Sequence, residues 1–262
     1  MRLLSGMTLA VCFLCGSLSV AQDKSKSMPM KKEAMAAKKM MMEPKAMESA
    51  KMMMMDEKSM VPMMVAKEMM HQEMMHDKEV MGMVEKGAMM KPSDDMMMMS
   101  DKNVEMATEK MMADPTAMQM LFQELVARHI AGKKMKMMME KPDGKMMSKS
   151  GKEMKAMMMD EESMMMAKKE MMSSEESAMM MAHESLVHSL MQDKEVMAMV
   201  EKAAMMQDDP KMAPMMSDEK MKMASDAMMK DKEQMKGMMH STMMRQIVDG
   251  KQKMMKGDMK KK

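Results

Sequence analysis

Methionine is the residue from which any hydrophobic core of this chain has to be built. It supplies 71 of the 262 residues, whereas residues 22 to 262 contain only four leucines, two isoleucines, ten valines and one phenylalanine. An ordinary folded domain uses far more of these branched and aromatic side chains. Because methionine rotates about several side-chain bonds, it fills space without specifying one arrangement. We therefore expect a loosely packed, dynamic helical protein.

A repeated sequence frame predicts where helices begin. The frame Met-x-Asp-(Lys/Pro)-(Glu/Thr)-x-Met occurs four times, around Asp77, Asp114, Asp193 and Asp231. Aspartate is favoured at the N-cap of a helix, and proline, which follows Asp114, is tolerated at the first helical position. We predict that a helix begins at each aspartate. The alternative is one continuous helix through each of the three aspartates that lack the proline.

The repeat also predicts the fold class. Segments 69 to 90 and 185 to 206 share the frame DKEVM-x-MVEK at a distance of 116 positions. Leu186 and Leu190 lie on one helical face of the second segment, and Met70 and Met74 take the same places in the first. Such an exchange conserves volume and typically costs less than about 1.5 kcal/mol in a core. We predict an all-α protein of two related helical modules, each with two helical repeat units.

Composition and turn residues divide the chain further. Arg2 and the apolar run after it, which ends in small residues at Ser19 and Ala21, are typical of a signal peptide. In the Met-rich, low-complexity residues 22 to 60 and 145 to 172, the apolar side chains keep to no single stripe, so we expect marginal stability or disorder. The predicted segments are a signal peptide (1 to 21), a Met- and Lys-rich segment (22 to 60), helical module 1 (61 to 140), a low-complexity linker (141 to 172), helical module 2 (173 to 250) and a basic tail (251 to 262).

Cleavage after Ala21 implies a periplasmic or secreted protein. It removes Cys12 and Cys15, so the mature chain forms no disulfide, and it leaves no run long and apolar enough to span a membrane. Lipidation of Cys15 is the alternative, although Leu14 is bulkier than the small residue that precedes such a cysteine. The mature chain then carries sulfur only in thioethers, which persist in an oxidising compartment where thiols do not.

Charge and residue inventory exclude several classes of function. The chain has 42 basic and 40 acidic residues and neither Trp nor Tyr, so it offers no field and almost no stacking platform for nucleic acid. It contains no Gly-rich phosphate loop and no Ser, His and acid arrangement beyond what chance places together. We predict no catalytic residue, no nucleic-acid partner and no enzyme activity.

Runs of consecutive methionines carry the strongest functional signal. Successive helical residues point about 100° apart, so a run such as Met52 to Met55 cannot face one core, and many thioethers have to be exposed. A soft sulfur donor suits Cu(I) or Ag(I), and methionines one turn apart place two donors on one face. An exposed thioether can instead be oxidised to the sulfoxide and restored by a reductase. Metal binding depends on spacing, whereas oxidant scavenging depends only on number and exposure.

The predicted metal ligands combine methionine runs with histidines that have methionine one turn away. Chance alone gives about four of six histidines such a neighbour in a chain this rich in methionine, so the pairing adds no weight. No tightly bound cofactor is expected beyond Cu(I) or Ag(I). The predicted ligands are Met52, Met53, Met54, Met55, His71, Met74, Met75, Met96, Met97, Met98, Met99, Met179, Met180, His183, His188, Met191, His240, Met243 and Met244.

The signal peptide, the MMMM runs, the abundant Lys and Glu and the absence of cysteine beyond residue 21 resemble the methionine-rich periplasmic proteins of bacteria. These include copper and silver resistance binders and sacrificial proteins induced by reactive chlorine. The resemblance is one of composition, and it transfers no binding residue. This chain has fewer histidines than the silver binders and, unlike the smallest oxidant sinks, a recognisable repeat.

Three functions follow from these features. The prediction is an extracytoplasmic protein that binds Cu(I) or Ag(I) through thioether clusters. The first alternative is a sacrificial oxidant sink that protects envelope proteins and has a methionine sulfoxide reductase as its partner. The second is a helical interaction module whose pliable Met surface accepts apolar partner helices.

Overall fold

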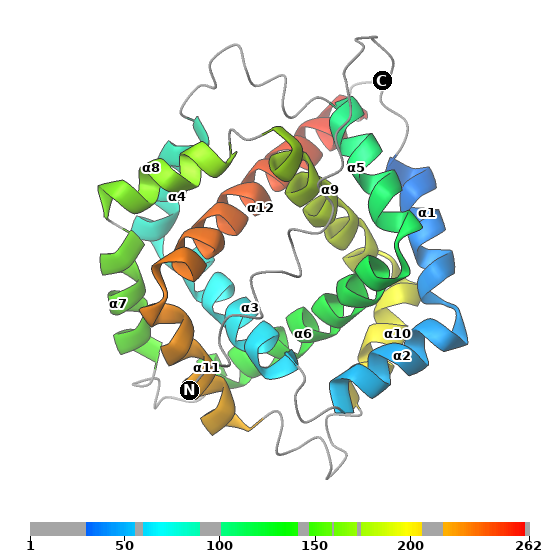
Figure 1. Cartoon of the computed structure of the whole chain (residues 1–262), viewed down its shortest axis with the longest axis horizontal. Coiled ribbons are helices and arrows are strands. Elements are labelled where there is room, and N and C mark those ends of the chain that lie inside the picture. The colour runs from blue at the N-terminus through cyan, green and yellow to red at the C-terminus, as the bar shows by residue number, and fades with distance from the viewer. Residues whose placement is uncertain are drawn as a thin grey trace, which may run out of the picture.

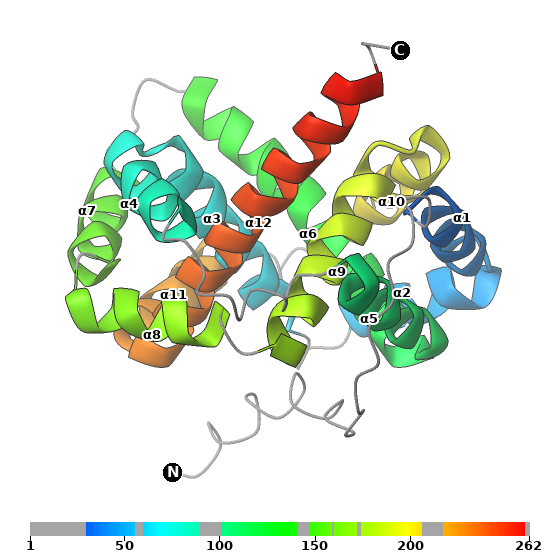
Figure 2. The ribbon, with the colours of Figure 1, turned by 90° about the horizontal axis from the view of Figure 1, so that it is seen from above.

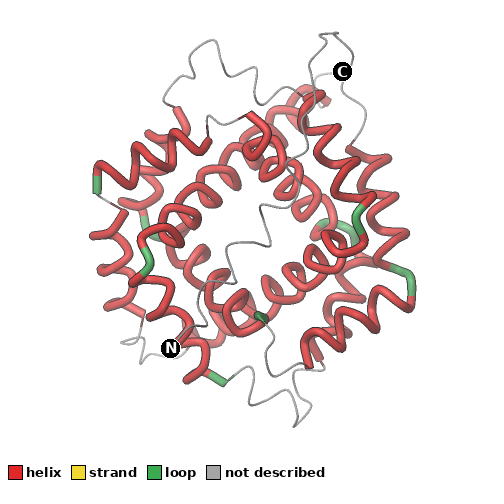
Figure 3. The backbone as a smooth tube through the Cα atoms, in the orientation of Figure 1, coloured by secondary structure: helices red, strands yellow, loops and turns green. Residues whose placement is uncertain are grey.

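The structure, a computed structural model, describes residues 30–55, 60–89, 101–140, 147–158, 160–171, 174–205 and 217–259. This part of the chain is helical throughout and has no strand, which confirms the all-α prediction (Figure 3). The predicted signal peptide, residues 260 to 262 of the basic tail and the Met96 to Met99 run lie outside the described residues. The helices are α1 (Met30–Met41), α2 (Pro44–Met55), α3 (Val61–His76), α4 (Lys78–Met89), α5 (Asp101–Ala113), α6 (Pro115–Glu140), α7 (Met147–Met158), α8 (Glu161–Met171), α9 (Ser174–Met191), α10 (Lys194–Met205), α11 (Asp218–Lys230) and α12 (Lys232–Met259).

Each of the four repeated aspartates caps a helix, as predicted. The Asp77 Oδ1 atom accepts hydrogen bonds from the backbone N–H groups of Glu79 (2.9 Å) and Val80 (3.1 Å), at the start of α4. These bonds satisfy donors that have no partner within the helix. One helix therefore ends and the next begins at each aspartate, and the alternative of a continuous helix is wrong. The corresponding caps of α6, α10 and α12 are Asp114, Asp193 and Asp231.

Four helices form the centre of the molecule. In Figure 1, α3, α6, α9 and α12 make the sides of a square, and each contacts the next around it. Seen from above in Figure 2, α4, α7, α8 and α11 lie on one side of these four helices, and α1, α2, α5 and α10 lie on the other. The centre of the fold is therefore shared by helices from both halves of the sequence.

Helices from the two predicted modules are interleaved. Helix α5 packs against α9 and α11 packs against α3, while α4 packs against α12 and α10 against α6. Segments 61 to 140 and 173 to 250 thus contact each other along several helices instead of meeting at one small interface. The two-module organisation and its boundaries stay a prediction.

The buried stripe uses methionine where its repeat uses leucine. Met70 and Met74 are as buried as Leu186 and Leu190, at 3% and 1% exposure in both pairs. They join one large core with Val84 and other branched residues. This confirms that methionine stands in for leucine on the buried face of the repeat.

The low-complexity segments are ordered helices where the structure describes them. Helices α1, α2, α7 and α8 fall within residues 22 to 60 and 145 to 172, so the expectation of disorder is wrong for these parts. Helices α1, α7 and α8 each bury one small stripe against the core, such as Ala37 with Met41 and Met154 with Met158, and α2 packs its partly buried Met47 there. Methionines on the other faces of these helices hide this i, i+4 stripe from a sequence pattern.

None of the described helices combines the length and apolar character that a membrane span requires. This agrees with the predicted absence of a span from the part of the chain that follows the signal peptide.

The caps give a first testable prediction. Replacing Asp77 with Ala removes the oxygen that accepts two backbone hydrogen bonds at the start of α4 and should lower the free energy of unfolding by about 1 kcal/mol. Asp77→Asn keeps an acceptor and should cost less. Urea unfolding followed by circular dichroism measures both, with Glu85→Ala on the exposed face of α4 as the control. Equal stability of Asp77→Ala and this control would contradict the capping role.

Candidate functional site

The predicted metal ligands are spread over the described structure. Among them Met52, Met75 and Met191 are exposed, and Met179, Met180, His183 and His188 are partly buried. The ligands in the interior are His71, Met74, His240, Met243 and Met244. Met53, Met54 and Met55 belong to α2, but their side chains lie outside the described part, as do Met96, Met97, Met98 and Met99 entirely.

Two of these ligands meet in one place. Met180 of α9 packs against a small buried cluster made by Met181, Met244 and Val248, which joins α9 to α12. The histidines, in contrast, have oxygen partners among the described residues. His71 Nε2 lies 3.2 Å from the backbone oxygen of Met238, and His188 Nδ1 lies 3.5 Å from Asp249 Oδ1. The metal assignment stays a prediction.

Methionine differs from the other large apolar residues in where it lies. No leucine, isoleucine, valine or phenylalanine among the described side chains is exposed. Methionine occupies both the core and the surface, and exposed methionine contributes nothing that packing requires. All twelve exposed large apolar side chains of the described structure are Met35, Met42, Met52, Met60, Met75, Met106, Met137, Met139, Met165, Met191, Met205 and Met223.

The exposed methionines are isolated along their helices. Nine of the twelve have no methionine three or four positions away in either direction; the exceptions are Met52, Met60 and Met139. Met35, for example, has only lysines at these four positions. A helix therefore does not supply most exposed thioethers with a second sulfur donor one turn away. This spacing suits a reaction that each thioether undergoes alone.

The centre of the four-helix square holds a buried network of charges that the sequence reasoning missed. Arg128 of α6 donates to both carboxylate oxygens of Glu184 of α9, at 2.6 and 3.3 Å. Arg245 of α12 donates to both oxygens of Glu68 of α3, at 2.8 and 3.1 Å. Each Arg Nε also faces the other glutamate, at 3.6 Å from Glu68 and 3.4 Å from Glu184. Four charges thus join all four inner helices.

The sequence did contain a signal for this network. Arg128 and Arg245 are the only arginines beyond residue 2, in a chain that otherwise takes its positive charge from lysine. They lie 117 positions apart, and Glu68 and Glu184 lie 116 apart, which matches the spacing of the repeat. Arginine is the residue suited to buried, bidentate carboxylate pairing, because it stays charged and presents a planar fork of donors. The rarity of arginine is therefore informative.

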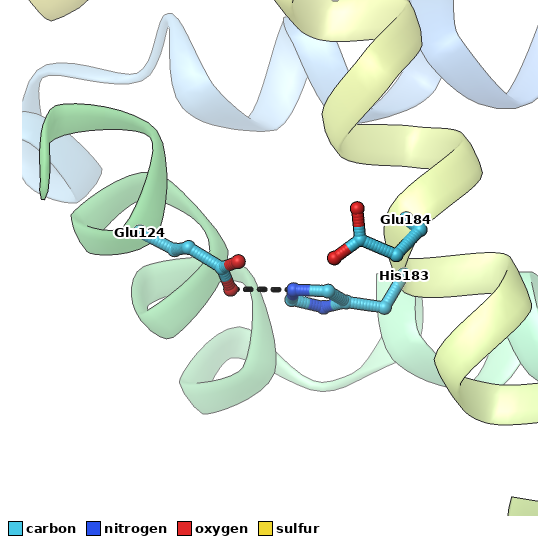
Figure 4. A group of neighbouring side chains, drawn as sticks. All are labelled: Glu124, His183 and Glu184. Carbon is cyan, nitrogen blue, oxygen red and sulfur yellow. Dashed lines mark hydrogen bonds and ion pairs between the residues drawn. The ribbon is translucent and has the colours of Figure 1, made fainter. Parts of the chain in front are cut away.

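Glu124 and His183 extend the network on one side (Figure 4). Their Oε2 and Nε2 atoms lie 2.5 Å apart. Burial opposes the charge on each group, but the Glu124 carboxylate raises the pKa of His183, while His183 and Arg128 hold the pKa of Glu124 well below its usual value. With His183 protonated, three carboxylates face two guanidinium groups and one imidazolium, so the network is electrically neutral.

This neutrality disfavours a metal ion at the same place. One ligand atom each from Glu124, His183 and Glu184 lie within 4.8 Å of one another, which is close enough for a hard or borderline cation. A cation would have to displace the proton of His183 and compete with Arg128 and Arg245 for the carboxylates. The arrangement is therefore suited to an ion-pair network more than to a metal centre.

Two further histidines lie in the interior. Burial lowers the pKa of His71 and of His240 to about 4, so both are neutral near pH 7. Neutral His71 can donate its Nε2 proton to the Met238 carbonyl. Burial opposes the charge of Glu68, but Arg245 and Arg128 keep it ionised and its pKa is lowered to about 2.

Comparison of the chain with protein families, with curated proteins and with solved structures finds no match.

The network gives a second prediction. Arg128→Met leaves Glu184 buried without its bidentate partner and should lower the free energy of unfolding by about 3 to 5 kcal/mol. Lys202→Met on the exposed face of α10 is the control. The double variant Arg128→Met with Glu184→Met removes both charges and should lose less than the sum of the two single changes. Urea unfolding of the set measures this; strict additivity would contradict the pairing.

A third prediction concerns pH. His183 binds its proton more tightly in the folded protein, so the stability that it contributes is complete below its ordinary pKa of 6.5 and is lost as the pH rises through its raised pKa. The groups facing it are Glu124, Arg128 and Glu184. The difference in unfolding free energy between the wild type and His183→Gln should therefore shrink as the pH rises above about 6.5 and through the raised pKa of His183. A pH-independent difference would contradict the ion pair.

Proposed function

We propose that this protein is a sacrificial methionine sink that consumes two-electron oxidants such as hypochlorous acid. The observation that carries the proposal is the placement of methionine: it is the sole large apolar residue on the described surface, and nine of the twelve exposed copies have no second methionine one turn away. Scavenging needs exposed thioethers in number and does not need them in pairs.

The chemistry at each site is simple and local. The thioether sulfur gives up two electrons and gains one oxygen atom, while hypochlorous acid is reduced to chloride and a proton is released. A methionine sulfoxide reductase, supplied with two electrons and two protons, restores the thioether and releases water. The predicted signal peptide supports an activity outside the cytoplasm, where the sink would protect envelope proteins.

The division between core and surface supports repeated use. A sulfoxide at an exposed position keeps its oxygen in water, so it removes no buried contact and leaves no polar group without a partner. A sulfoxide at a buried position such as Met74 or Met118 would place a polar oxygen in the core. The surface can therefore react first while the valines, leucines and charge network of the interior hold the helices.

Soft-metal binding is the second candidate. The cluster of Met180, Met181 and Met244 brings three thioethers from two helices together, largely shielded from water. Thioethers bind Cu(I) or Ag(I) without losing a proton, so burial does not weaken them as donors. This cluster supports a small number of metal sites, whereas the isolated surface methionines do not.

The sink proposal predicts an order of oxidation. Under limiting hypochlorite, exposed Met35, Met165 and Met223 should become sulfoxides before buried Met74 and Met118, because oxidant has to reach the sulfur. Helix content should hold until the exposed set has reacted, and a sulfoxide reductase should reverse the change. Peptide mass spectrometry and circular dichroism on the same samples measure both. Helix loss during the first equivalents would sink the proposal.

The metal candidate predicts a localised effect. Competition against a Cu(I) chelator should show uptake of at least one equivalent per chain, with little binding of Zn(II). The double variant Met181→Leu with Met244→Leu conserves volume and should remove about one equivalent. Met70→Leu with Met74→Leu, in another part of the core, is the matched control. No uptake at micromolar free Cu(I) would remove this candidate.

A further inference from the structure

A shielded lysine faces a methionine sulfur across the contact between α8 and α12. Lys236 of α12 has a side chain that is only 5% exposed, and its Nζ contacts Met166 Sδ of α8. The same ammonium pairs with Glu233 Oε1 at 2.7 Å. A thioether is a weak hydrogen-bond acceptor, so the ammonium gives up water for a poor partner on its α8 side.

A second pair has the same form. Lys134 of α6 lies 3.8 Å from Met221 Sδ of α11 and 2.7 Å from Asp218 Oδ1, and its side chain is 14% exposed. In both places a lysine contacts a surface carboxylate and a thioether on a helix other than its own; Asp218 and Met221 share α11, whereas Glu233 lies on α12 with Lys236. Met221 is buried, whereas Met166 is partly exposed and follows the exposed Met165. Oxidant therefore has readier access to Met166.

We infer that Met166 is an oxidation site whose sulfoxide is bound by the Lys236 ammonium within the folded protein. The inference rests on the proposed function as an oxidant sink and names a site where oxidation strengthens a contact. Hypochlorous acid takes two electrons from the Met166 sulfur and leaves as chloride and a proton, and the sulfur gains a strong acceptor oxygen. The ammonium already placed at the sulfur then donates to that oxygen.

The consequence for the fold follows from where the pair lies. Helix α8 runs along α12, and one turn beyond the Met166–Lys236 contact Glu170 Oε2 lies 3.9 Å from His240 Nδ1. At most buried methionines a sulfoxide oxygen would lack a donor and would loosen the packing. At Met166 the new charge-assisted bond ties α8 to α12, so this edge of the molecule tightens as the exposed methionines are consumed.

Glutamine substitution tests the inference without oxidant, because its side-chain carbonyl presents an acceptor oxygen near the place of a sulfoxide oxygen. Hydrogen exchange of residues 160 to 171, read by mass spectrometry, reports the opening of α8. Met166→Gln should make this opening about tenfold rarer than in the wild type, as a charge-assisted bond would. Met165→Gln, at the neighbouring exposed position, should leave it unchanged.

Lysine variants show whether the ammonium is responsible. With Lys236→Leu, Met166→Gln should make α8 open more often, and Lys236→Arg should restore the protection. Lys236→Leu removes both the donor and the Lys236–Glu233 ion pair. Glu233→Gln removes the ion pair alone, so it serves as the control for that loss. If Lys236→Leu does not fold, the comparison of Met166→Gln with Met165→Gln decides the question. Looser α8 in Met166→Gln with Lys236 present would overturn the inference.

Oxidation of the wild type completes the test. After limiting hypochlorite, protein carrying sulfoxide at Met166 should keep or gain protection in α8. Met166 remaining reduced after Met165 and the other exposed methionines have reacted would also overturn the inference, while leaving the sink proposal intact. Failure of the sink proposal would be recognised by a different result: loss of helix throughout the chain during the first equivalents of hypochlorite.

Discussion

Two buried arginine–glutamate pairs are the interaction on which the arrangement of this protein depends. Arg128 with Glu184 and Arg245 with Glu68 connect the four inner helices, and all four side chains are at most 10% exposed. Buried ion pairs add little net stability, because desolvation offsets their attraction, but a misplaced partner is very costly. A core filled with flexible methionine does not select one helix register by shape. The bidentate pairs supply that selection, since they form in only one arrangement.

The pairing also explains why the helices interleave. Arg128 bonds to Glu184 and Arg245 bonds to Glu68, so each bidentate pair joins the first half of the chain to the second. The same exchange recurs where α5 packs on α9 and α11 packs on α3. Neither half can open without exposing the buried face and the charges of the other. Cooperative unfolding of the whole structure is the physical consequence.

Methionine serves two purposes, one in the interior and one on the surface. In the interior it replaces leucine, as at Met74, and its cost is a loss of shape specificity that the charge network offsets. On the surface it stands among lysines and glutamates, where packing does not need it and oxidant can reach it. The carboxylates and guanidinium groups at the centre carry no sulfur, so the groups that hold the helices differ from those that react. The Lys236–Met166 contact links the two parts, because there a reacting sulfur also lies at a helix interface.

Features that depend on only a few neighbouring residues could be predicted from the sequence. The aspartate caps and the helix starts were predicted from neighbouring residues, and the exchange of Leu186 and Leu190 for Met70 and Met74 from a comparison of the two repeat segments. The structure bears them out. The necessary exposure of many methionines followed equally from the geometry of a helix. Only the tertiary structure decided that α1, α2, α7 and α8 are ordered, that the two halves interleave, and that Arg128 meets Glu184. These outcomes depend on burial and on partners 56 or more positions away. A local sequence pattern does not show which charged groups will be desolvated. The two arginines were visible as rare residues, but their meaning required knowing what lay opposite them.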